Sequence, residues 1–241
     1  MIETRTLRFD SEDIGVYISG DGVYNAPERD YEMVSIPGKN GQLAIDHGRY
    51  ENIEVTYPCF IWANTQQEFR EKIRTIRAKL TSKLGYKRLE DTYHPDEYRM
   101  AIYKAGIEVD PVYYNRAGEF ELTFDCKPQR YLTVGDEPIT VTSGDTLTNP
   151  TRFESLPLIE ATGVGTLTVG NISVTITGTS SQVLYIDCEM MDAYTISGGA
   201  IIAANDKISL NDSAFPTLSG ETGITYTGLS SVKITPRWWT L

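Results

Sequence analysis

Residues Ser35–Asp46 read SIPGKNGQLAID, and the Gly-Lys pair in this stretch decides between two kinds of fold. A phosphate-binding loop has four residues between its first glycine and a Gly-Lys-Ser/Thr triplet, with a buried strand before it and a helix after it. Here Lys39 is followed by Asn40-Gly41, and apolar–polar alternation resumes at Leu43 and Ile45. Asn-Gly favours positive φ at both central turn positions. The stretch therefore predicts a turn between extended segments and not a phosphate site.

The segments on either side of this turn have the composition of short strands. Runs rich in Val, Ile, Tyr and Phe occupy residues 2–9, 14–18, 30–36, 50–61, 99–108 and 112–126, the last two separated by VDPV. Strands in this order, mostly antiparallel and interrupted by one helix, predict an α+β domain.

The helix is predicted in Thr65–Gly85, TQQEFREKIRTIRAKLTSKLG. Thr65 and Glu68 form a capping-box pattern, in which each side chain satisfies a free backbone N–H of the first turn. The apolar positions step by 4, 3, 4 and 4, which marks one helix face: Phe69, Ile73, Ile76, Leu80 and Leu84. Gly85 is the expected C-terminal stop.

The composition changes near residue 134. Lys and Arg number 18 in residues 1–133 and 4 in 134–241, whereas Asp and Glu number 22 and 11, so the two parts carry net charges of −4 and −7. The stretch from 133 to 157 has three prolines and many Ser and Thr residues, which suits a connector containing one short strand. We therefore predict domains at 1–133 and 157–241, joined by a connector at 134–156.

The second part is typical of an antiparallel β-sandwich. TLTVGNISVTI, Thr166–Ile176, alternates on both sides of Gly170-Asn171, which is a two-residue hairpin signal. Further short strands follow at about ten-residue spacing in QVLYIDCE, AYTISGGAII, GITYTG and SVKITPRWW.

Bulk composition excludes several classes of function. The net charge of −11 argues against a protein that binds nucleic acid through its phosphates. The three cysteines, Cys59, Cys126 and Cys188, provide neither a disulfide framework nor a CxxC metal site. No segment has the pattern of a signal peptide or a membrane span, so we expect an intracellular product without membrane insertion. With only His47 and His94 in the chain, catalytic triads have almost no candidates, and we expect no enzyme, no catalytic residues and no cofactor.

Two charged segments have both a functional and a plain interpretation. EDTYHPDEY gathers Glu90, Asp91, His94, Asp96 and Glu97, but the spacing matches no metal-ligand pattern, so we expect no metal and a solvated acidic loop. The predicted helix carries a polar side that is either an acidic-partner surface or a solvated face: Arg70, Lys72, Arg74, Arg77, Lys79 and Lys83.

Several segments, taken in order, resemble the distal tail proteins (Dit) of long-tailed, siphovirus bacteriophages. YEMVSIPGKNGQLAIDHGRYENIEVTYPCFI is similar to that family's aromatic-rich strand, PG-x-x-G turn and second strand. The capped helix and FELTFDCKPQRYL, Phe120–Leu132, continue the resemblance, and YIDCEMMDAY and the closing Pro-Arg-Trp-Trp segment resemble the C-terminal galectin-like sandwich. Together these segments cover nearly the whole chain.

The resemblance implies a mainly β protein with an N-terminal α+β ring-forming domain, a sheet or barrel with one helix, and a C-terminal galectin-like β-sandwich. It implies a structural virion protein: a homohexameric ring at the phage tail tip, made in the host cytoplasm. Its expected partners are copies of itself, the tail tube protein, the tail-tip or tail-associated protein and receptor-binding components of the baseplate used in host adsorption. A galectin-like fold does not imply sugar binding.

Three segments are predicted to make these protein contacts, each with a plain alternative. The Pro37–Gly48 region, with Pro37, Gly38, Lys39, Asn40, Gly41 and His47, and the Asp91–Glu97 loop are ring or tube contacts or ordinary solvent loops. Trp238 and Trp239 alternate on a terminal strand, so we expect one in the core. The other is an interface anchor, a sugar-stacking platform, or covered by the connector.

Two rival functions come from other classes. A carbohydrate-binding module would use the paired tryptophans and the 15 tyrosines for stacking on sugar rings. A cell-wall hydrolase would need paired carboxylates, and Asp187, Glu189 and Asp192 show no sign of that role, since alternate residues of a strand share a face in any case.

Overall fold

The computed structural model describes residues 5–20, 22–82, 84–112, 116–177 and 182–241. The chain divides into two compact units, residues 1–130 with Leu241 and residues 131–240. Each unit has its own apolar core.

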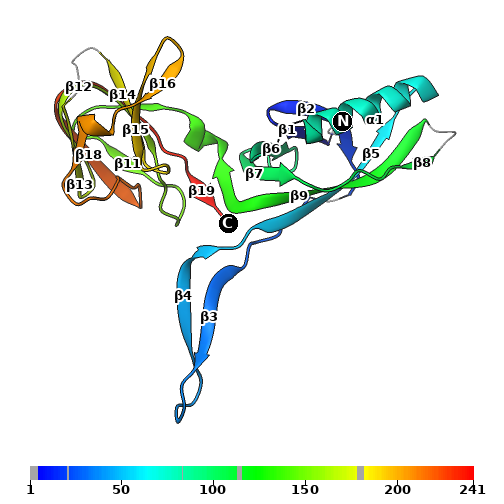
Figure 1. The fold of residues 1–241 in the computed structure, drawn as a ribbon, viewed down its shortest axis with the longest axis horizontal. Helices are drawn as coiled ribbons and strands as arrows, with labels where there is room; N and C mark the ends of the chain where they lie inside the picture. The colour runs from blue at the N-terminus through cyan, green and yellow to red at the C-terminus, as the bar shows by residue number, and fades with distance from the viewer. Residues whose placement is uncertain (1–4, 21, 83, 113–115, 178–181) are drawn as a thin grey trace. The chain divides into compact units, whose positions relative to one another are not determined.

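The first unit is a closed antiparallel barrel with one helix (Figure 1). Its elements are β1 Thr6–Phe9, β2 Glu12–Ile18, β3 Arg29–Ser35, β4 Gln42–Tyr50, β5 Ile53–Trp62, α1 Gln66–Thr81, β6 Lys87–Asp91, β7 Glu97–Tyr103, β8 Asp110–Val112 and β9 Ala117–Leu132. The strand order is β9-β5-β2-β1-β6-β7, and β9 also pairs with β7, so the sheet closes on itself. β8 adds to the edge of β9.

Helix α1 confirms the predicted cap and most of the predicted apolar face. The Thr65 hydroxyl accepts a hydrogen bond from the Glu68 N–H at 3.1 Å, while Glu68 Oε2 accepts one from the Asn64 N–H at 2.9 Å. The four apolar positions from Phe69 to Leu80 are buried in the barrel core. The extension to Leu84 is wrong, because the helix ends at Thr81 and Leu84 is 88% exposed.

Three strand expectations in this unit need correction. β6 was not predicted, since its sequence KRLED is charged and shows no apolar run. The VDPV segment, expected to separate two strands, contains β8. The strand expected at 112–126 is instead β9, which begins at Ala117 and runs to Leu132.

The second unit is an antiparallel sandwich built from one folded sheet, to which all its strands except β19 belong; β19 pairs with β9. Its strands are β10 Ile139–Val141, β11 Thr146–Thr148, β12 Leu158–Val169, β13 Ile172–Ile176, β14 Val183–Asp187, β15 Asp192–Ser197, β16 Ala200–Ala203, β17 Ile208–Leu210, β18 Glu221–Thr235 and β19 Trp239–Thr240, with short 3-10 turns at Thr133–Asp136 and Asn205–Lys207. The order is β10-β18-β12-β14-β15-β16, with β11 on β18, β13 on β12 and β17 on β13. The Gly170-Asn171 hairpin between β12 and β13 is confirmed.

Two long strands, β12 and β18, bend where their backbones approach closely. The first half of β12 pairs with β14 and the second half with β13, and the register with β18 shifts between Thr162 and Thr166. A Cβ on Gly165 would lie 1.9 Å from the Thr227 carbonyl oxygen, and a Cβ on Gly228 would lie 2.4 Å from that of Val164. Two strands were predicted from GITYTG and SVKITPRWW, but glycines at the bend let β18 pass through both segments as one strand.

Residues 134–156, predicted to be a connector with one short strand, contain β10 and β11. Both strands pair with β18. Val141 and Leu147 contribute to the core of the second unit. These residues are therefore integrated into the sheet of the second unit.

Candidate functional site

The β3–β4 hairpin forms its own two-stranded sheet, and the Pro37–Gly41 stretch lies at its tip. The loop between Ser35 and Gln42 has six residues, and positive φ occurs at Gly38 and Gly41. The prediction of a turn between extended segments is confirmed. The expected positive φ at Asn40 is wrong, because in this wider loop the two glycines reverse the chain.

Charged side chains fasten the base of the hairpin. Arg29 Nε donates to Asp46 Oδ1 at 3.0 Å, and Asp30 accepts from His47 Nδ1 at 2.8 Å and from Arg49 Nε at 2.6 Å. Hydrogen bonds from Arg29 and from the Gly48 N–H lower the pKa of Asp46 to about 2. Hydrogen bonds from His47 and Arg49 lower that of Asp30. The predicted contact residue His47 thus bridges the two strands at their base.

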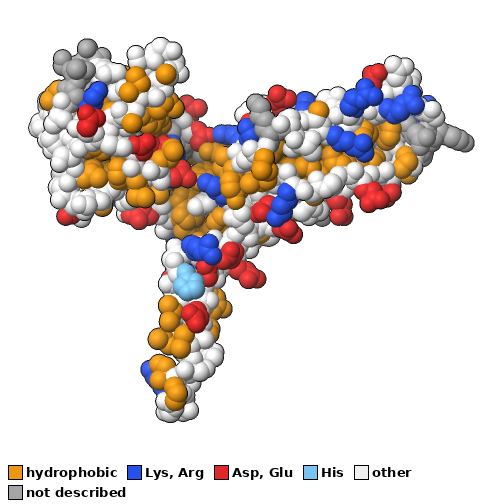
Figure 2. Space-filling model, viewed as in Figure 1, with side chains coloured by type: hydrophobic (Ala, Val, Ile, Leu, Met, Phe, Trp, Pro, Cys, Tyr) orange, Lys and Arg blue, Asp and Glu red, His pale blue; other side chains and the backbone are white. Residues whose placement is uncertain are grey.

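The middle of the hairpin is apolar on both faces. Cross-strand partners share a face, so Tyr31, Met33 and Ala44 lie on one side and Val34, Leu43 and Ile45 on the other. The exposed fraction is 56% for Tyr31, 50% for Leu43 and 42% for Ile45. Figure 2 shows hydrophobic side chains along the hairpin. An isolated two-stranded hairpin is marginally stable in water, and contiguous exposed apolar surface marks an interaction site.

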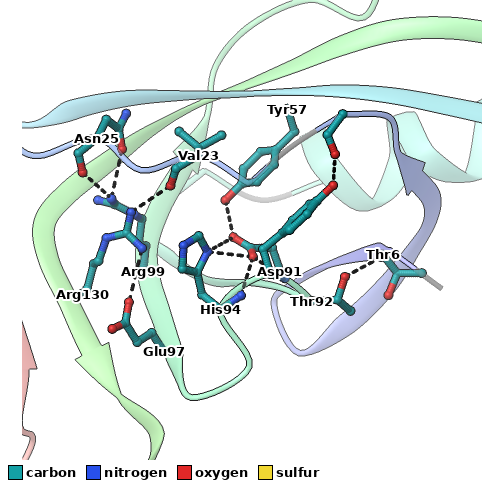
Figure 3. A network of polar contacts seen from close by, with 12 residues as sticks. Thr6, Val23, Asn25, Tyr57, Asp91, Thr92, His94, Glu97, Arg99 and Arg130 are labelled. Atoms are coloured by element: carbon teal, nitrogen blue, oxygen red, sulfur yellow. Dashed lines mark hydrogen bonds and ion pairs between the residues drawn. The ribbon is translucent and has the colours of Figure 1, made fainter. Parts of the chain in front are cut away.

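The Asp91–Glu97 turn connects β6 to β7, and the Asp91 side chain at its start points toward Tyr57 (Figure 3). Asp91 Oδ2 accepts from the Tyr57 hydroxyl at 2.8 Å, and Oδ1 accepts from the Tyr93 N–H at 2.9 Å and the His94 N–H at 3.0 Å. His94 Nδ1 lies 3.0 Å from Asp91 Oδ1. Burial, followed by the nearby Asp91 charge, raises the pKa of Tyr57. The expectation of a solvated acidic loop is wrong for Asp91 and His94, because these side chains hold the turn on the barrel.

A second part of this network involves two arginines that the sequence analysis did not single out. Arg130 Nη1 lies 3.2 Å from Glu97 Oε2, and Arg130 Nη2 donates to the Val23 carbonyl at 3.0 Å. Arg99 Nη2 donates to Asn25 Oδ1 at 3.2 Å. Burial, together with the charge of Arg130, lowers the pKa of Arg99. The local sequence around Arg99 and Arg130 does not predict these hydrogen bonds, because the partners are up to 107 residues away.

The two tryptophans near the C-terminus both pack against residues of the second unit. Trp238 is buried in its core. Trp239 stacks on Phe153 with ring centroids 4.5 Å apart, and its indole N–H donates to the Glu154 carbonyl at 2.9 Å. Of the three interpretations of the second tryptophan, covering by the preceding connector is the one the contacts support.

Other candidate chemistries receive no support from the described parts of the chain. No group of three or more His, Cys, Asp or Glu residues among them is placed to hold a metal ion. Cys59, Cys126 and Cys188 are free and buried, and burial raises the pKa of each thiol to about 12. No helix within the described ranges has the length and apolar character needed to cross a membrane.

The first unit, a barrel with one packed helix, is largely covered by a known family model. Residues 9–126 match the family model of the phage tail protein RIFT-related domain. The resemblance to distal tail proteins of siphoviruses is thereby confirmed.

Solved structures share the fold of both units at low sequence identity. The crystal structure of phage SPP1 Dit, described as a paradigm of the hub adsorption apparatus of phages infecting Gram-positive bacteria, matches with 13% identity and a TM-score of 0.72 over 96% of this chain and 98% of that one. The phage P2 baseplate in its activated conformation with Ca matches with 9% identity and a TM-score of 0.58 over 97% and 98%. The corresponding structure with Sr gives 10% and 0.55 over 95% and 97%. A search of curated protein sequences finds no match.

Proposed function

We propose that this chain is a structural virion protein of the distal tail, a hub that forms a hexameric ring between the tail tube and the tail-tip or baseplate components. The family match of residues 9–126 and the full-length likeness to SPP1 Dit support a structural role in the tail. In this proposal the protein is made in the host cytoplasm, and the partners of the ring are the tail tube protein, the tail-tip protein and receptor-binding components.

The observation that carries the proposal is the β3–β4 hairpin. Its base is held by ion pairs, whereas its middle exposes apolar side chains on both faces. A monomer gains nothing from such a hairpin, since neither face packs on a core. A second protein surface that covers it would bury Tyr31, Met33, Leu43 and Ile45, and each buried apolar side chain favours association.

A ring is the simplest assembly that uses this hairpin in every copy. The hairpin is one surface and its receiving site is another, so the contact is heterologous, and heterologous contacts close into rings when the rotation allows. The tip residues Pro37–Gly41 then lie within or beside the neighbouring copy or against the tail tube.

Light scattering of the full-length protein over a range of concentrations tests the ring. We expect a species near six times the 27.0 kDa protomer mass, or a climb toward it with concentration. Electron microscopy of the same sample should show annular particles. A monomer at all concentrations, combined with absence of the protein from purified tails by mass spectrometry, would contradict the proposal.

The carbohydrate-binding alternative has lost its main support. It rested on the paired tryptophans together with the 15 tyrosines, and the tryptophans no longer support it, because Trp238 is in the core and Trp239 stacks on Phe153. We therefore propose that the second unit acts in protein contacts of the baseplate.

A further inference from the structure

Helix α1 presents three arginines that have no anionic partner within the described ranges of the chain. Arg70, Arg74 and Arg77 are spaced by 4 and 3, so they form one row, and Figure 2 shows basic side chains gathered over α1. Among the described residues no carboxylate makes an ion pair with any of the three. The helix lysines differ, because Lys72 pairs with Glu68 at 3.0 Å and Lys79 with Glu12 at 3.6 Å.

These arginines line an open groove of about 420 Å³ whose floor is apolar. Its other lining residues are Phe69, Ile73, Val109 and Pro111. Glu71, the nearest carboxylate along the helix, accepts a hydrogen bond from Gln67 at 3.0 Å. We call this surface, defined by Arg70, Arg74 and Arg77, the arginine row.

An acidic groove lies on the other side of the same strand segment. Val109 and Pro111 line the groove of the arginine row, whereas Glu108 and Asp110, just before and at the start of β8, line a second groove of about 630 Å³. Glu119 and Glu121 of β9 line it as well. We call Glu108, Asp110, Glu119 and Glu121 the acid patch; all four are exposed.

The acid patch has no compensating cation among the residues that the structure describes. Asp110 lies directly opposite Glu119 in the β8–β9 ladder, and like charges in that position destabilise a sheet. No lysine or arginine in the described residues pairs with any of the four carboxylates. Arg116, which with Glu119 lines an adjoining hollow, makes no ion pair with it in the same residues. External cations would relieve this repulsion.

We infer that the arginine row of one copy docks on the acid patch of the next copy. The two surfaces carry opposite charge and are similar in size. The arginine row, from Arg70 to Arg77, is about 10 Å long at the rise of an α-helix. The acid patch measures about 7 Å along the chain and about 5 Å between the paired strands. The two surfaces are different patches of the same unit, on either side of residues 108–111, so a contact between them joins two copies head-to-tail and suits a closed ring. This inference rests on the proposed ring and names the surfaces that join its protomers.

Charge reversal in the full-length protein tests the docking. The variant R70E/R74E/R77E places negative charge on both surfaces, and E108K/E119K/E121K places positive charge on both. Each variant alone should need at least a tenfold higher concentration for assembly, because like charges then face each other. An equimolar mixture of the two should assemble as the wild type does, and so should the six-fold variant, whose net charge equals that of the wild type.

The control R152E/K207E/K233E has the same change in net charge as the arginine variant but lies in the second unit. Its assembly should match that of the wild type, and denaturation curves should show that all variants are folded. Assembly of the wild type should weaken as salt increases, since exposed ion pairs are screened.

Other outcomes would overturn the docking inference in distinguishable ways. If both triple variants assemble like the wild type, the ring stands and other surfaces form it. If folded variants remain monomeric in the mixture and in the six-fold variant, or if only the arginine variant is impaired, the arginine row faces another acidic partner. If the wild type itself is monomeric at every concentration, the docking fails together with the proposed ring.

Discussion

Asp187 and Arg237 form a two-point ion pair in the second unit. Nη1 and Nη2 of Arg237 each lie 2.8 Å from one carboxylate oxygen of Asp187. Asp187 ends β14 and Arg237 precedes β19, so the pair ties the C-terminal segment to the sandwich. The Asp187 side chain is only 7% exposed, so removing its partner leaves a buried charge.

We expect Arg237→Ala to lower the free energy of unfolding by about 3 kcal/mol, because breaking a buried pair leaves one charge uncompensated. Chemical denaturation followed by far-UV circular dichroism measures this loss. Arg237→Lys keeps the charge but not the two-point geometry and should lose less. Equal unfolding curves for the wild type and Arg237→Ala would contradict the structural role.

The Asp187–Arg237 pair also makes the free energy of unfolding depend on pH in the acidic range. Burial raises the pKa of Asp187, but hydrogen bonds from Arg237 and from the Met190 and Glu189 N–H groups outweigh it and hold the pKa below 3.8. A lowered folded-state pKa contributes stability above the unfolded pKa, and this contribution is lost as the pH falls through the folded value. The free energy of unfolding of the wild type should therefore fall more steeply below about pH 4 than that of Asp187→Asn. Parallel profiles would show that Asp187 contributes nothing to the acid dependence.

The apolar hairpin faces predict an effect on association without one on folding. Leu43→Ser with Ile45→Ser should weaken self-association at least about tenfold, since roughly 1.4 kcal/mol of lost burial corresponds to that factor. Light scattering measures it, and the denaturation midpoint should be unchanged because both side chains are exposed in the single chain. Ile201→Ser with Ile202→Ser removes similarly exposed isoleucines from the second unit and serves as the control. Equal effects from both pairs would point to general stickiness and not to a hairpin contact.

We expect the Asp91 side chain to stabilise the folded protein. Asp91→Ala leaves the Tyr57 hydroxyl and two backbone N–H groups without their acceptor, and we expect a loss of roughly 2–4 kcal/mol in the free energy of unfolding. Asp91→Asn retains one carbonyl oxygen at this position and should lose less. Thermal unfolding distinguishes the two; a stable Asp91→Ala protein would mean that the turn holds without this side chain.

The bend between β12 and β18 has a steric test. Gly165→Ala would force a methyl group against the Thr227 carbonyl, so we expect a loss of roughly 3 kcal/mol. Gly223→Ala, elsewhere in β18, meets nothing within 4 Å and should change little. Denaturant titration of both variants gives the comparison, and equal stability of the two would show that the bend relaxes at little cost.

Local signals in the sequence predicted most of the elements that rest on local physics. The Thr65–Glu68 cap, the apolar face from Phe69 to Leu80 and the Gly170-Asn171 turn each depend on residues within one or two turns of chain. The ends of elements were less accurate: the helix stops at Thr81, although the apolar spacing continues to Leu84.

Features that depend on distant partners were not predictable in this way. β6 is charged and becomes a strand because β1 and β7 flank it. Asp91 looks like a loop carboxylate, but Tyr57, 34 residues away, gives it a buried partner. The helical spacing predicts the arginine row. The acid patch instead depends on the pairing of β8 with β9, which no local pattern in the sequence predicts.

The β3–β4 hairpin also bears on how the protein survives before assembly. A two-stranded sheet that has only its own backbone ladder and the ion pairs at its base, with no core to pack on, is the kind of segment that opens first and is cut first by proteases. Limited proteolysis of the hairpin therefore reports the unassembled fraction, and its protection would mark the moment when a copy is incorporated. The exposed hairpin would therefore limit the lifetime of the free subunit, because copies that find no partner are those most readily degraded.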